Sequence, residues 1–234
     1  MEFIREVLGI ISQYYSYLLS GVGYTMLIAL IGTAAGFLIG LITGVIRTAP
    51  RSKNAVVRVL HKIVNAIIAV YIEVFRGTPM MVQAMVIYWG YAFLNDGATL
   101  PLIPAGLFIV SINTGAYMAE IIRAGIESVD RGQMEASRSL GLSYGSSMAL
   151  VVVPQAVRTM IPSIINQFII TLKDTSILSV IGFPELVNTA KNVVANTMSA
   201  FQVWTIVAVM YLVGITLLSR LAKKVERRLN RGRQ

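Results

Sequence analysis

The sequence predicts an all-α integral membrane protein with five transmembrane helices, the second of which is interrupted. Three observations lead to this prediction: 56% of the 234 residues are hydrophobic, only 13% are charged, and the apolar residues gather into long segments. A soluble domain of this size cannot bury so much apolar surface. The net charge of +9 does not indicate nucleic-acid binding, because the basic residues stand beside the apolar segments rather than over a soluble face.

Each of five apolar segments is long enough to cross a hydrocarbon core, which takes about 20 helical residues. The second segment is too long for one plain crossing, because its helix would measure about 55 Å. Phe75-Arg-Gly-Thr-Pro79 divides it. We expect one membrane domain over residues 1–234, with the first span retained, because the N-terminus lacks the features of a cleaved signal peptide. The five segments cover residues 19–46, 58–94, 102–124, 147–172 and 202–221.

The distribution of basic residues predicts the orientation. Connections 47–62 and 123–138 are rich in Lys and Arg, and the tail from Arg220 holds seven of them. The positive-inside rule places all three in the cytoplasm. A double crossing by 58–94 would separate them, so we predict one interrupted crossing, an external N-terminus and a cytoplasmic C-terminus. The basic tail is expected to anchor a helix end at anionic headgroups; a partner-binding role is the alternative.

The interruption at Arg76-Gly77-Thr78-Pro79 predicts a substrate site. Thr78 is expected to cap a new helix and Pro79 to be its first residue. The unpaired amides of such a helix end attract anions, and transporters aim them at carboxylates. Arg76 adds a second positive group. The alternative is a kink that only shapes the helix bundle.

Two polar stripes run along apolar segments. Ser163, Gln167, Thr171 and Asp174 follow at intervals of four, four and three, and Asn113, Tyr117 and Glu120 at four and three, so each set shares one helical face. Intramembrane carboxylates of this kind mark functional sites. Hydrogen bonding between helices is the alternative, and for the Glu120 stripe, where Arg123 follows Glu120 by three residues, it is the favoured interpretation. A helix-end anion site facing Gln167 and Asp174 suits a zwitterion such as an α-amino acid.

The segment 123–154 predicts a short amphipathic helix near 133–140, a stop at Gly141 and re-entry into the membrane through Pro154. A plain surface loop is the alternative. The pattern Glu135-Ala-Ser-x3-Gly141-x9-Val151-x-Val-Pro154 resembles the EAA loop of membrane subunits of ATP-binding-cassette importers, with Ser137 replacing an alanine. Further segments resemble the permease family for polar amino acids, which includes glutamine, histidine, arginine and cystine permeases. These segments are Glu73-Val-Phe-Arg-Gly-Thr-Pro79, Ala116-Tyr-Met-Ala-Glu-Ile-Ile-Arg123, Gln133-Met-Glu-Ala136, Val153-Pro-Gln155 and Leu172-Lys-Asp-Thr-Ser176.

The resemblance implies a type I ABC importer permease fold in the inner membrane of a bacterial or archaeal cell. It implies four partners: a cytoplasmic ATPase, a second permease subunit (identical or similar), an extracytoplasmic amino-acid-binding protein and the lipid bilayer. ATP and Mg²⁺ would bind to the ATPase, and no cofactor to this chain. The coupling helix, about 133–141, would contact the ATPase through Glu135, Ala136, Ser137 and Gly141.

The candidate substrate residues are Arg76, Gly77, Thr78, Asn113, Tyr117, Gln167, Thr171 and Asp174. Related permeases for basic amino acids often have Glu at the position matching Gln167, so this chain, with one carboxylate fewer, is expected to prefer a neutral polar or zwitterionic substrate such as glutamine or cystine. An ion-coupled secondary amino-acid transporter, with Asp174 and Glu120 relaying protons, is the alternative function.

The chain itself is not expected to be an enzyme. No glycine is followed by lysine, so the phosphate-binding loop of ATPases is missing, and no catalytic residue is predicted. The absence of cysteine and the single His61 give no set of metal ligands, so no metal site is expected.

Overall fold

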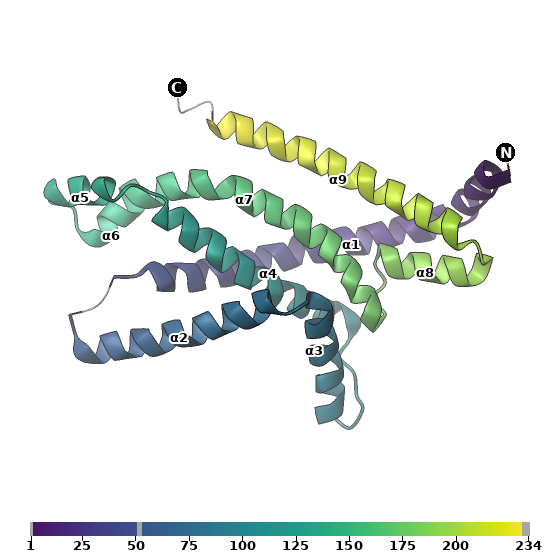
Figure 1. Cartoon of the computed structure of the whole chain (residues 1–234), viewed down its shortest axis with the longest axis horizontal. Coiled ribbons are helices and arrows are strands. Elements are labelled where there is room, and N and C mark those ends of the chain that lie inside the picture. The colour runs from purple at the N-terminus through teal and green to yellow at the C-terminus, as the bar shows by residue number, and fades with distance from the viewer. Residues whose placement is uncertain (1, 51–52, 231–234) are drawn as a thin grey trace. The chain divides into compact units, whose positions relative to one another are not determined.

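The computed structural model describes residues 2–50 and 53–230, and every regular element in these ranges is helical, as predicted (Figure 1). The longer helices are α1 (Glu2–Thr48), α2 (Ala55–Gly77), α3 (Met80–Leu94), α4 (Leu102–Glu127), α7 (Val153–Asp174) and α9 (Ala200–Asn230). The shorter ones are α5 (Arg131–Ser139), α6 (Tyr144–Ser147), α8 (Leu186–Thr197), a π-helical turn at Met148–Val152 and a 3₁₀ helix at Thr175–Ile181.

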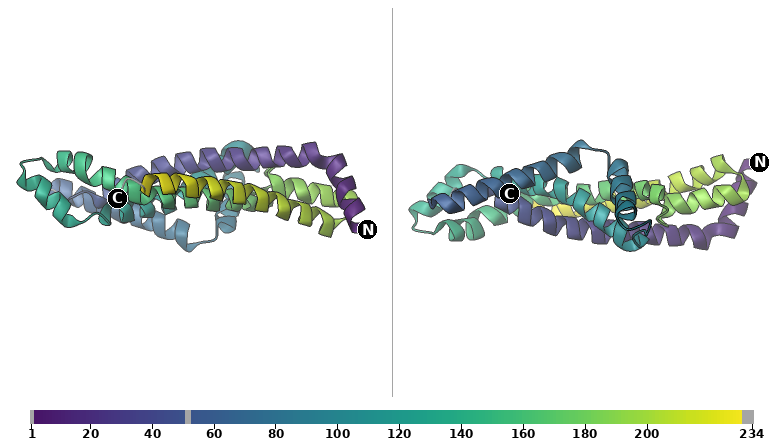
Figure 2. Two further views of the ribbon diagram at one scale, coloured as in Figure 1. Left: turned by 90° about the horizontal axis from the view of Figure 1, so that it is seen from above. Right: turned by 90° about the horizontal axis from the view of Figure 1, so that it is seen from below.

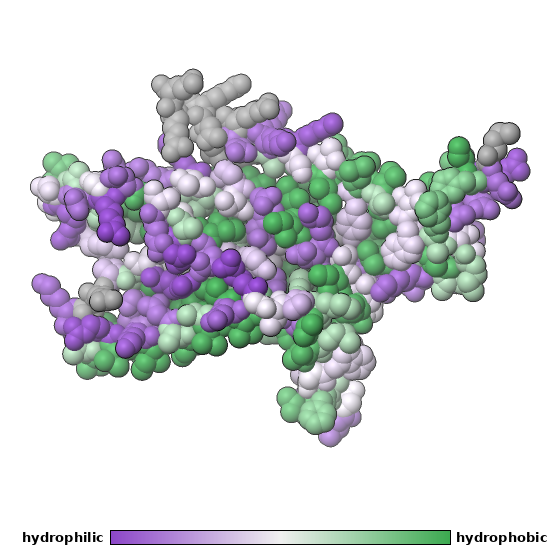
Figure 3. Space-filling model, in the orientation of Figure 1, coloured by the Kyte–Doolittle hydropathy of each residue, from purple (hydrophilic) through white to green (hydrophobic). Residues whose placement is uncertain are grey.

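Five helices of the described residues are long and apolar enough to cross a membrane, which agrees with the predicted number. They are Glu2–Thr48, Ala55–Gly77, Leu102–Glu127, Tyr144–Ile181 and Ala200–Lys224, and α3 is a shorter apolar helix. The first helix begins 17 residues before the predicted span and would measure about 70 Å, so only part of it fits within a bilayer. Large apolar side chains cover much of the exterior (Figure 3), as contact with lipid requires.

The helices form two compact units. The first takes in the chain up to Thr33, Thr78–Ser111 and Phe168–Leu221. One of its cores joins α3, α4 and the 3₁₀ helix around Phe183, and a second joins α1, α8 and α9 around Leu18 and Val203. Figure 2 shows α8 and α9 running beside the N-terminal part of α1. The unit therefore contains Thr171 and Asp174, the last two residues of the polar stripe that begins at Ser163.

The second unit takes in Ala34–Gly77, Ile112–Gln167 and the chain from Ala222 on. Its cores pack Ile68 and Ile72 of α2 against Ala116 and Ala119 of α4, and Ile122 of α4 against Met160 of α7. These contacts position the C-terminal end of α2 beside the polar face of α4.

A ladder of small residues lets α1 approach α4 closely. Glycines at four-residue intervals on α1 lie against residues at four-residue intervals on α4, and an added Cβ atom would come within 3.0 Å of each partner. Such spacing is typical of tightly packed membrane helices. The pairs are Gly32 with Val110 in the first unit, and Gly36 with Thr114, Gly40 with Met118 and Gly44 with Ile122 in the second.

Candidate functional site

The break between α2 and α3 lies where the sequence predicts it, but the new helix begins one residue later than expected. Pro79, not Thr78, is its N-cap, with φ −63° and ψ 135°, and Met80 is the first helical residue. The reason is that the Pro79 carbonyl accepts the first helical hydrogen bonds, from the amides of Val82 at 3.0 Å and Gln83 at 3.2 Å.

Thr78 has a different function in this turn. The side-chain amide of Gln83 donates to the Thr78 carbonyl at 2.9 Å and to its hydroxyl at 2.8 Å. Gln83 is buried, and these bonds hold the turn that leads into α3. Sequence analysis missed Gln83, although a lone amide within an apolar helix is a signal that was available.

Polar groups of α4 bind the end of α2 in the second unit. The Tyr71 hydroxyl donates to the Ile112 carbonyl at 2.6 Å, and the side-chain amide of Asn113 donates to the Phe75 carbonyl at 3.5 Å. Carbonyls in the last turn of a helix lack partners within the helix, so an amide at this position satisfies one of them. Asn113, which is buried, therefore holds the backbone just before Arg76.

Arg76 lies beside a second predicted residue, Tyr117. Its guanidinium carbon is 5.5 Å from the centre of the Tyr117 ring, within the range of a cation–π interaction. A guanidinium nitrogen is 3.9 Å from Glu120, and 44% of the side chain is exposed. Arg76 is thus partly neutralised but remains accessible. Among the described residues, these groups share a cavity of about 550 Å³ that Arg47, Ala69, Ile72, Glu73, Arg76, Gly77, Tyr117 and Glu120 line.

Glu120 is the centre of an ion-pair network and bonds Arg47 of α1, so it takes part in hydrogen bonding between helices, the interpretation favoured for its stripe. It binds Arg123 at 2.8 Å and also pairs with Arg47 at the end of α1, while Arg123 reaches Glu127 at 2.5 Å. Only the Arg123 contact is visible from sequence spacing, because Arg47 lies 73 residues away along the chain. The network balances most of the charge around the cavity.

The polar stripe of Ser163, Gln167, Thr171 and Asp174 follows one face of α7. Gln167 and Thr171 are buried, Asp174 is half-buried and ends the helix, and Ser163 is exposed. Gln167 belongs to the second unit, and Thr171 and Asp174 belong to the first. Gln167 is not among the residues that line the Arg76 cavity. The structure brings Arg76, Gly77 and Tyr117 to one cavity, and Asn113 bonds the Phe75 carbonyl just before Arg76.

The predicted amphipathic helix of the connector is α5, which begins two residues earlier than expected, at Arg131. The Asp130 side chain caps it by accepting from the Gly132 amide at 2.7 Å. At its other end, the amides of Gly141 and Leu142 donate to the carbonyls of Arg138 and Ser137, and Gly141 has a φ of +87°. These two hydrogen bonds together form the Schellman motif. The motif favours glycine because the residue after the helix cap takes a left-handed backbone conformation.

Exposure divides the four predicted coupling residues. Glu135, Ala136 and Gly141 are exposed, whereas Ser137 is only 4% exposed and its hydroxyl bonds the Met134 carbonyl. Ser137 therefore packs against its own chain. Leu140, which sequence analysis missed, is 84% exposed. A leucine at the cap of a polar helix was an available signal for a contact surface.

The predicted return into the membrane begins with a π-helical turn. The amide of Val153 donates to the Met148 carbonyl, five residues back, immediately before Pro154. Proline has no amide hydrogen to continue the ordinary helical ladder, which accounts for an irregular turn at this point. The turn joins α6 to α7 without breaking the helical path.

Comparison with known proteins identifies similar chains over most of the sequence. A family model described as binding-protein-dependent transport system inner membrane component matches residues 36–231. The glutamine transport system permease protein GlnP of Escherichia coli is 37% identical over 212 residues, 91% of this chain and 92% of that one. The arginine transport system permease protein ArtQ of Bacillus subtilis is 32% identical over 213 residues, with coverage of 91% and 92%. A chain from the crystal structure of an amino acid ABC transporter with histidines has a TM-score of 0.81 and 36% identity, covering 93% of this chain and 96% of that chain.

Proposed function

We propose that this chain, which belongs to the family of binding-protein-dependent transport system inner membrane components, is the membrane subunit of an ATP-driven importer that translocates a polar L-amino acid. The observation that carries the proposal is α5, a helix capped at both ends that presents Glu135, Ala136 and Leu140 to the exterior. A transport subunit that receives movement from a separate motor requires a rigid, exposed element of this kind.

An amino acid is favoured because its carboxylate suits the environment of Arg76. The guanidinium is accessible, and its 3.9 Å separation from Glu120 leaves room for a closer anionic partner. The names of the relatives support the same class, since they include a glutamine and an arginine permease. We place Arg76, Gly77, Thr78, Asn113 and Tyr117 at the carboxylate end of the substrate.

A neutral polar substrate is favoured over a basic one because α7 presents Gln167 and Asp174 on one face. One carboxylate matches one ammonium, and the Gln167 amide matches a polar side chain. A substrate with a second cation would lack a partner there. We therefore infer glutamine or cystine rather than arginine, with Thr171 on the same face contributing a hydroxyl.

The proposed assembly contains a cytoplasmic ATPase that holds ATP and Mg²⁺, a second permease subunit and an extracytoplasmic amino-acid-binding protein. The chain would be oriented with its N-terminus outside and α5 in the cytoplasm, because the connections rich in Lys and Arg lie at that end. Closure of the ATPases on ATP would push on α5 and change which side of the membrane the substrate residues face. Hydrolysis itself would take place on the ATPase.

The test is uptake by the complete transporter in proteoliposomes, with glutamine and arginine supplied in competition. Gln167→Glu adds a carboxylate where the second cation of arginine would lie, and we expect it to shift the ratio of arginine to glutamine uptake by about tenfold or more. Asp174→Asn should reduce uptake of both substrates by weakening the ammonium contact.

The matched control is Asn166→Glu, which adds the same carboxylate at the exposed neighbouring position of α7 and should leave the ratio unchanged. A wild-type preference for arginine would contradict the inferred substrate. If Gln167→Glu and Asn166→Glu behave alike, Gln167 does not contact the substrate. Uptake of neither amino acid, with no ATP dependence, would contradict the proposed function altogether.

A further inference from the structure

Glu73, which lines the Arg76 cavity, is an intramembrane carboxylate that the proposed function does not use. It lies on α2 within one of the five candidate spans, three residues before Arg76, and its side chain is exposed. Within the described ranges it forms no ion pair, in contrast to Glu120 and Glu127. A charged group in a membrane span is costly unless it meets water, a partner or a substrate. The position of Glu73 is therefore evidence for a function of this cavity.

Among the residues that the structure describes, Glu73 and Arg76 are the two charged groups of the cavity that lack a close ionic partner. Glu120 binds Arg123 at 2.8 Å and pairs with Arg47, so its nearest cations are already engaged. Arg76 is 3.9 Å from Glu120, a distance longer than a charge-assisted hydrogen bond of about 2.8 Å. The cavity therefore offers a ligand one negative and one positive group.

Small side chains leave room beside Glu73. Ala69, Glu73 and Gly77 follow at intervals of four residues on α2 and line the same cavity, so they share one helical face. A Cβ atom added to Gly77 would meet no atom within 4 Å. Arg76 is three residues from Glu73, a spacing at which Cβ atoms lie about 5–6 Å apart. Both side chains are described, and they form no ion pair with each other. A molecule that carries both charges can therefore bridge them.

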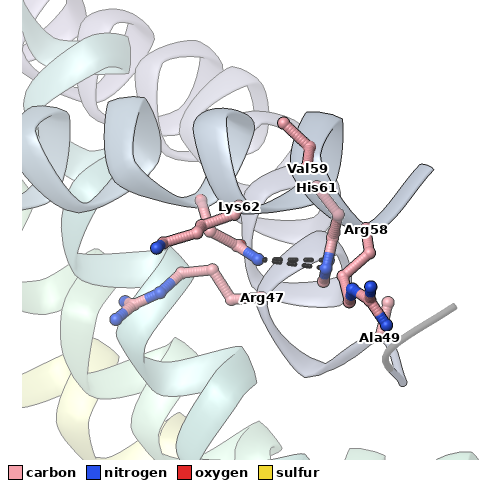
Figure 4. Close-up of a pocket in the computed structure, with 7 residues that line it drawn as sticks. Arg47, Ala49, Arg58, Val59, His61 and Lys62 are labelled. Carbon is pink, nitrogen blue, oxygen red and sulfur yellow. Dashed lines mark hydrogen bonds between the residues drawn. The ribbon is translucent and has the colours of Figure 1, made fainter. Parts of the chain in front are cut away.

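A second cavity, of about 560 Å³ at the start of α2, lacks this combination of charges. Its seven lining residues include Arg47, Arg58 and Lys62, and none of the seven is acidic. Figure 4 shows the charged groups of Arg58 and Lys62 pointing apart on either side of the His61 ring. Of these two cavities, which both include Arg47, the one at Arg76 presents the two charges that a zwitterion requires.

We propose that Glu73 is a further substrate-binding residue, which takes the ammonium group of the amino acid while Arg76 holds its carboxylate. The two charged groups of an α-amino acid are attached to the same carbon, so they suit two side chains that lie about one helical turn apart on α2. Asp174 is not among the residues that line this cavity. The ammonium group would therefore pass from Asp174 to Glu73 during transport and would meet one carboxylate at a time. The inference rests on the proposed function and names the residue that completes the Arg76 end of the site.

The experiment measures equilibrium binding of radiolabelled glutamine to the permease purified with its ATPase, without nucleotide and without the binding protein. Unlabelled glutamine competes with glutaramate, which is glutamine without its amino group. Wild type is expected to prefer glutamine. Glu73→Gln should reduce this preference by about tenfold, because a hydrogen bond between two charged groups is lost. Glu73→Asp keeps the charge and should retain most of the preference.

The matched control is Asp96→Asn, which removes an exposed carboxylate from the loop after α3 and should leave the preference within about twofold of wild type. Ala69→Leu is a second variant for the case in which Glu73→Gln fails to fold. Because Ala69 is exposed on the cavity wall, the added bulk enters the cavity rather than the core. It should weaken glutamine binding by about tenfold without any change of charge.

Failure of this inference differs from failure of the proposed function. If Glu73→Gln keeps the preference of wild type, or if Asp96→Asn loses it equally, Glu73 does not bind the ammonium group, and the proposed amino-acid transport is unaffected. Glutamine binding that Ala69→Leu leaves unchanged would also overturn the inference, because the cavity would then hold no substrate. If wild type binds neither glutamine nor arginine, the proposed function is wrong and the role of Glu73 is overturned with it.

Discussion

The positive charge of Arg76, beside a helix break, is partly neutralised by its neighbours. Its guanidinium stacks over Tyr117 and lies 3.9 Å from Glu120, which also pairs with Arg47 and Arg123. A substrate carboxylate that binds Arg76 would therefore compete with Glu120, which lies 3.9 Å from the guanidinium. The same network argues against ion-coupled transport, because Glu120, one of the two carboxylates considered for a proton relay, is surrounded by arginines.

Leu140 is the residue of the connector from which we expect the largest contact energy. Burying an exposed leucine stabilises an interface by about 1.5–3 kcal/mol, and Leu140 is 84% exposed. Leu140→Ala should raise the ATPase concentration needed for half-maximal complex formation by roughly tenfold. Titration of the permease in nanodiscs with the ATPase, followed by light scattering or fluorescence, measures this.

Leu150→Ala is the matched control, since Leu150 is 68% exposed in the π-helical turn before α7, where we expect lipid to cover it. It should leave the affinity within about twofold of wild type. Equal losses in the two variants would show that Leu140 is not part of the ATPase contact.

Glu185 predicts a pH dependence of stability. Its side chain is fully buried at the N-terminus of α8, where it accepts from the amides of Val187 and Asn188. Burial raises the pKa of Glu185 from 4.5 to about 7, although these two amides oppose the change. The folded state therefore binds the proton of the Glu185 carboxyl more tightly than the unfolded state does. The protonated carboxyl contributes to the stability of the folded state, and this contribution is fully present below pH 4.5 and is lost as the pH rises through 7.

We expect the melting temperature of wild type, measured relative to Glu185→Gln, to fall by a few degrees between pH 5 and pH 8. The glutamine keeps an oxygen for the α8 amides but does not titrate. Differential scanning fluorimetry in detergent at both pH values provides the measurement. A difference between the two proteins that stays constant with pH would contradict the prediction.

At the scale of elements, the glycine ladder of α1 is a packing feature that apolar periodicity does not reveal. A Cβ atom on Gly40 would lie 2.4 Å from the Met118 Cβ and 2.8 Å from the Ala119 amide nitrogen. Because backbone cannot yield as a flexible side chain does, Gly40→Ala must push α1 and α4 apart. Overpacking costs about 1–3 kcal/mol, so we expect the melting temperature to fall by roughly 3–10 °C.

Gly23→Ala on the same helix is the control, because no atom lies within 4 Å of the added methyl group. It should be neutral or slightly stabilising, since alanine favours helix more than glycine does. Comparison of the two variants by thermal denaturation separates packing from helix propensity. A Gly40→Ala protein as stable as Gly23→Ala would mean that the helices are not in close contact.

The α2–α3 break and α5 show which parts of an element sequence reasoning can place. Local chemistry predicted the break to within one residue, because Pro79 restricts its own φ angle and the conformation of Thr78. It also predicted the stop of α5, because Gly141 adopts a left-handed backbone. Local chemistry did not reveal Gln83, whose side chain binds the turn, because that contact depends on how the turn folds back.

At the scale of the whole molecule, the proposed orientation is testable because the chain contains no cysteine. Single-cysteine variants Asp96→Cys, after α3, and Ser139→Cys, at the end of α5, mark the two sides. Both positions are exposed. We expect a membrane-impermeant maleimide to label Asp96→Cys in intact cells and Ser139→Cys only after permeabilisation. Labelling of Ser139→Cys in intact cells would reverse the orientation.

The amino-acid sequence alone determined the membrane class, the five spans, the interrupted second segment and the connector that resembles importer permeases. Each of these depends on hydropathy, charge or backbone preference within a few residues. Only the tertiary structure decided that Glu120 pairs with Arg47, that Ser137 faces its own chain while Leu140 faces out, and that Arg58 and Lys62 share a cavity. Those outcomes depend on which helices pack together and in which register. Helix pairing and register are set jointly by residues that lie far apart in the chain.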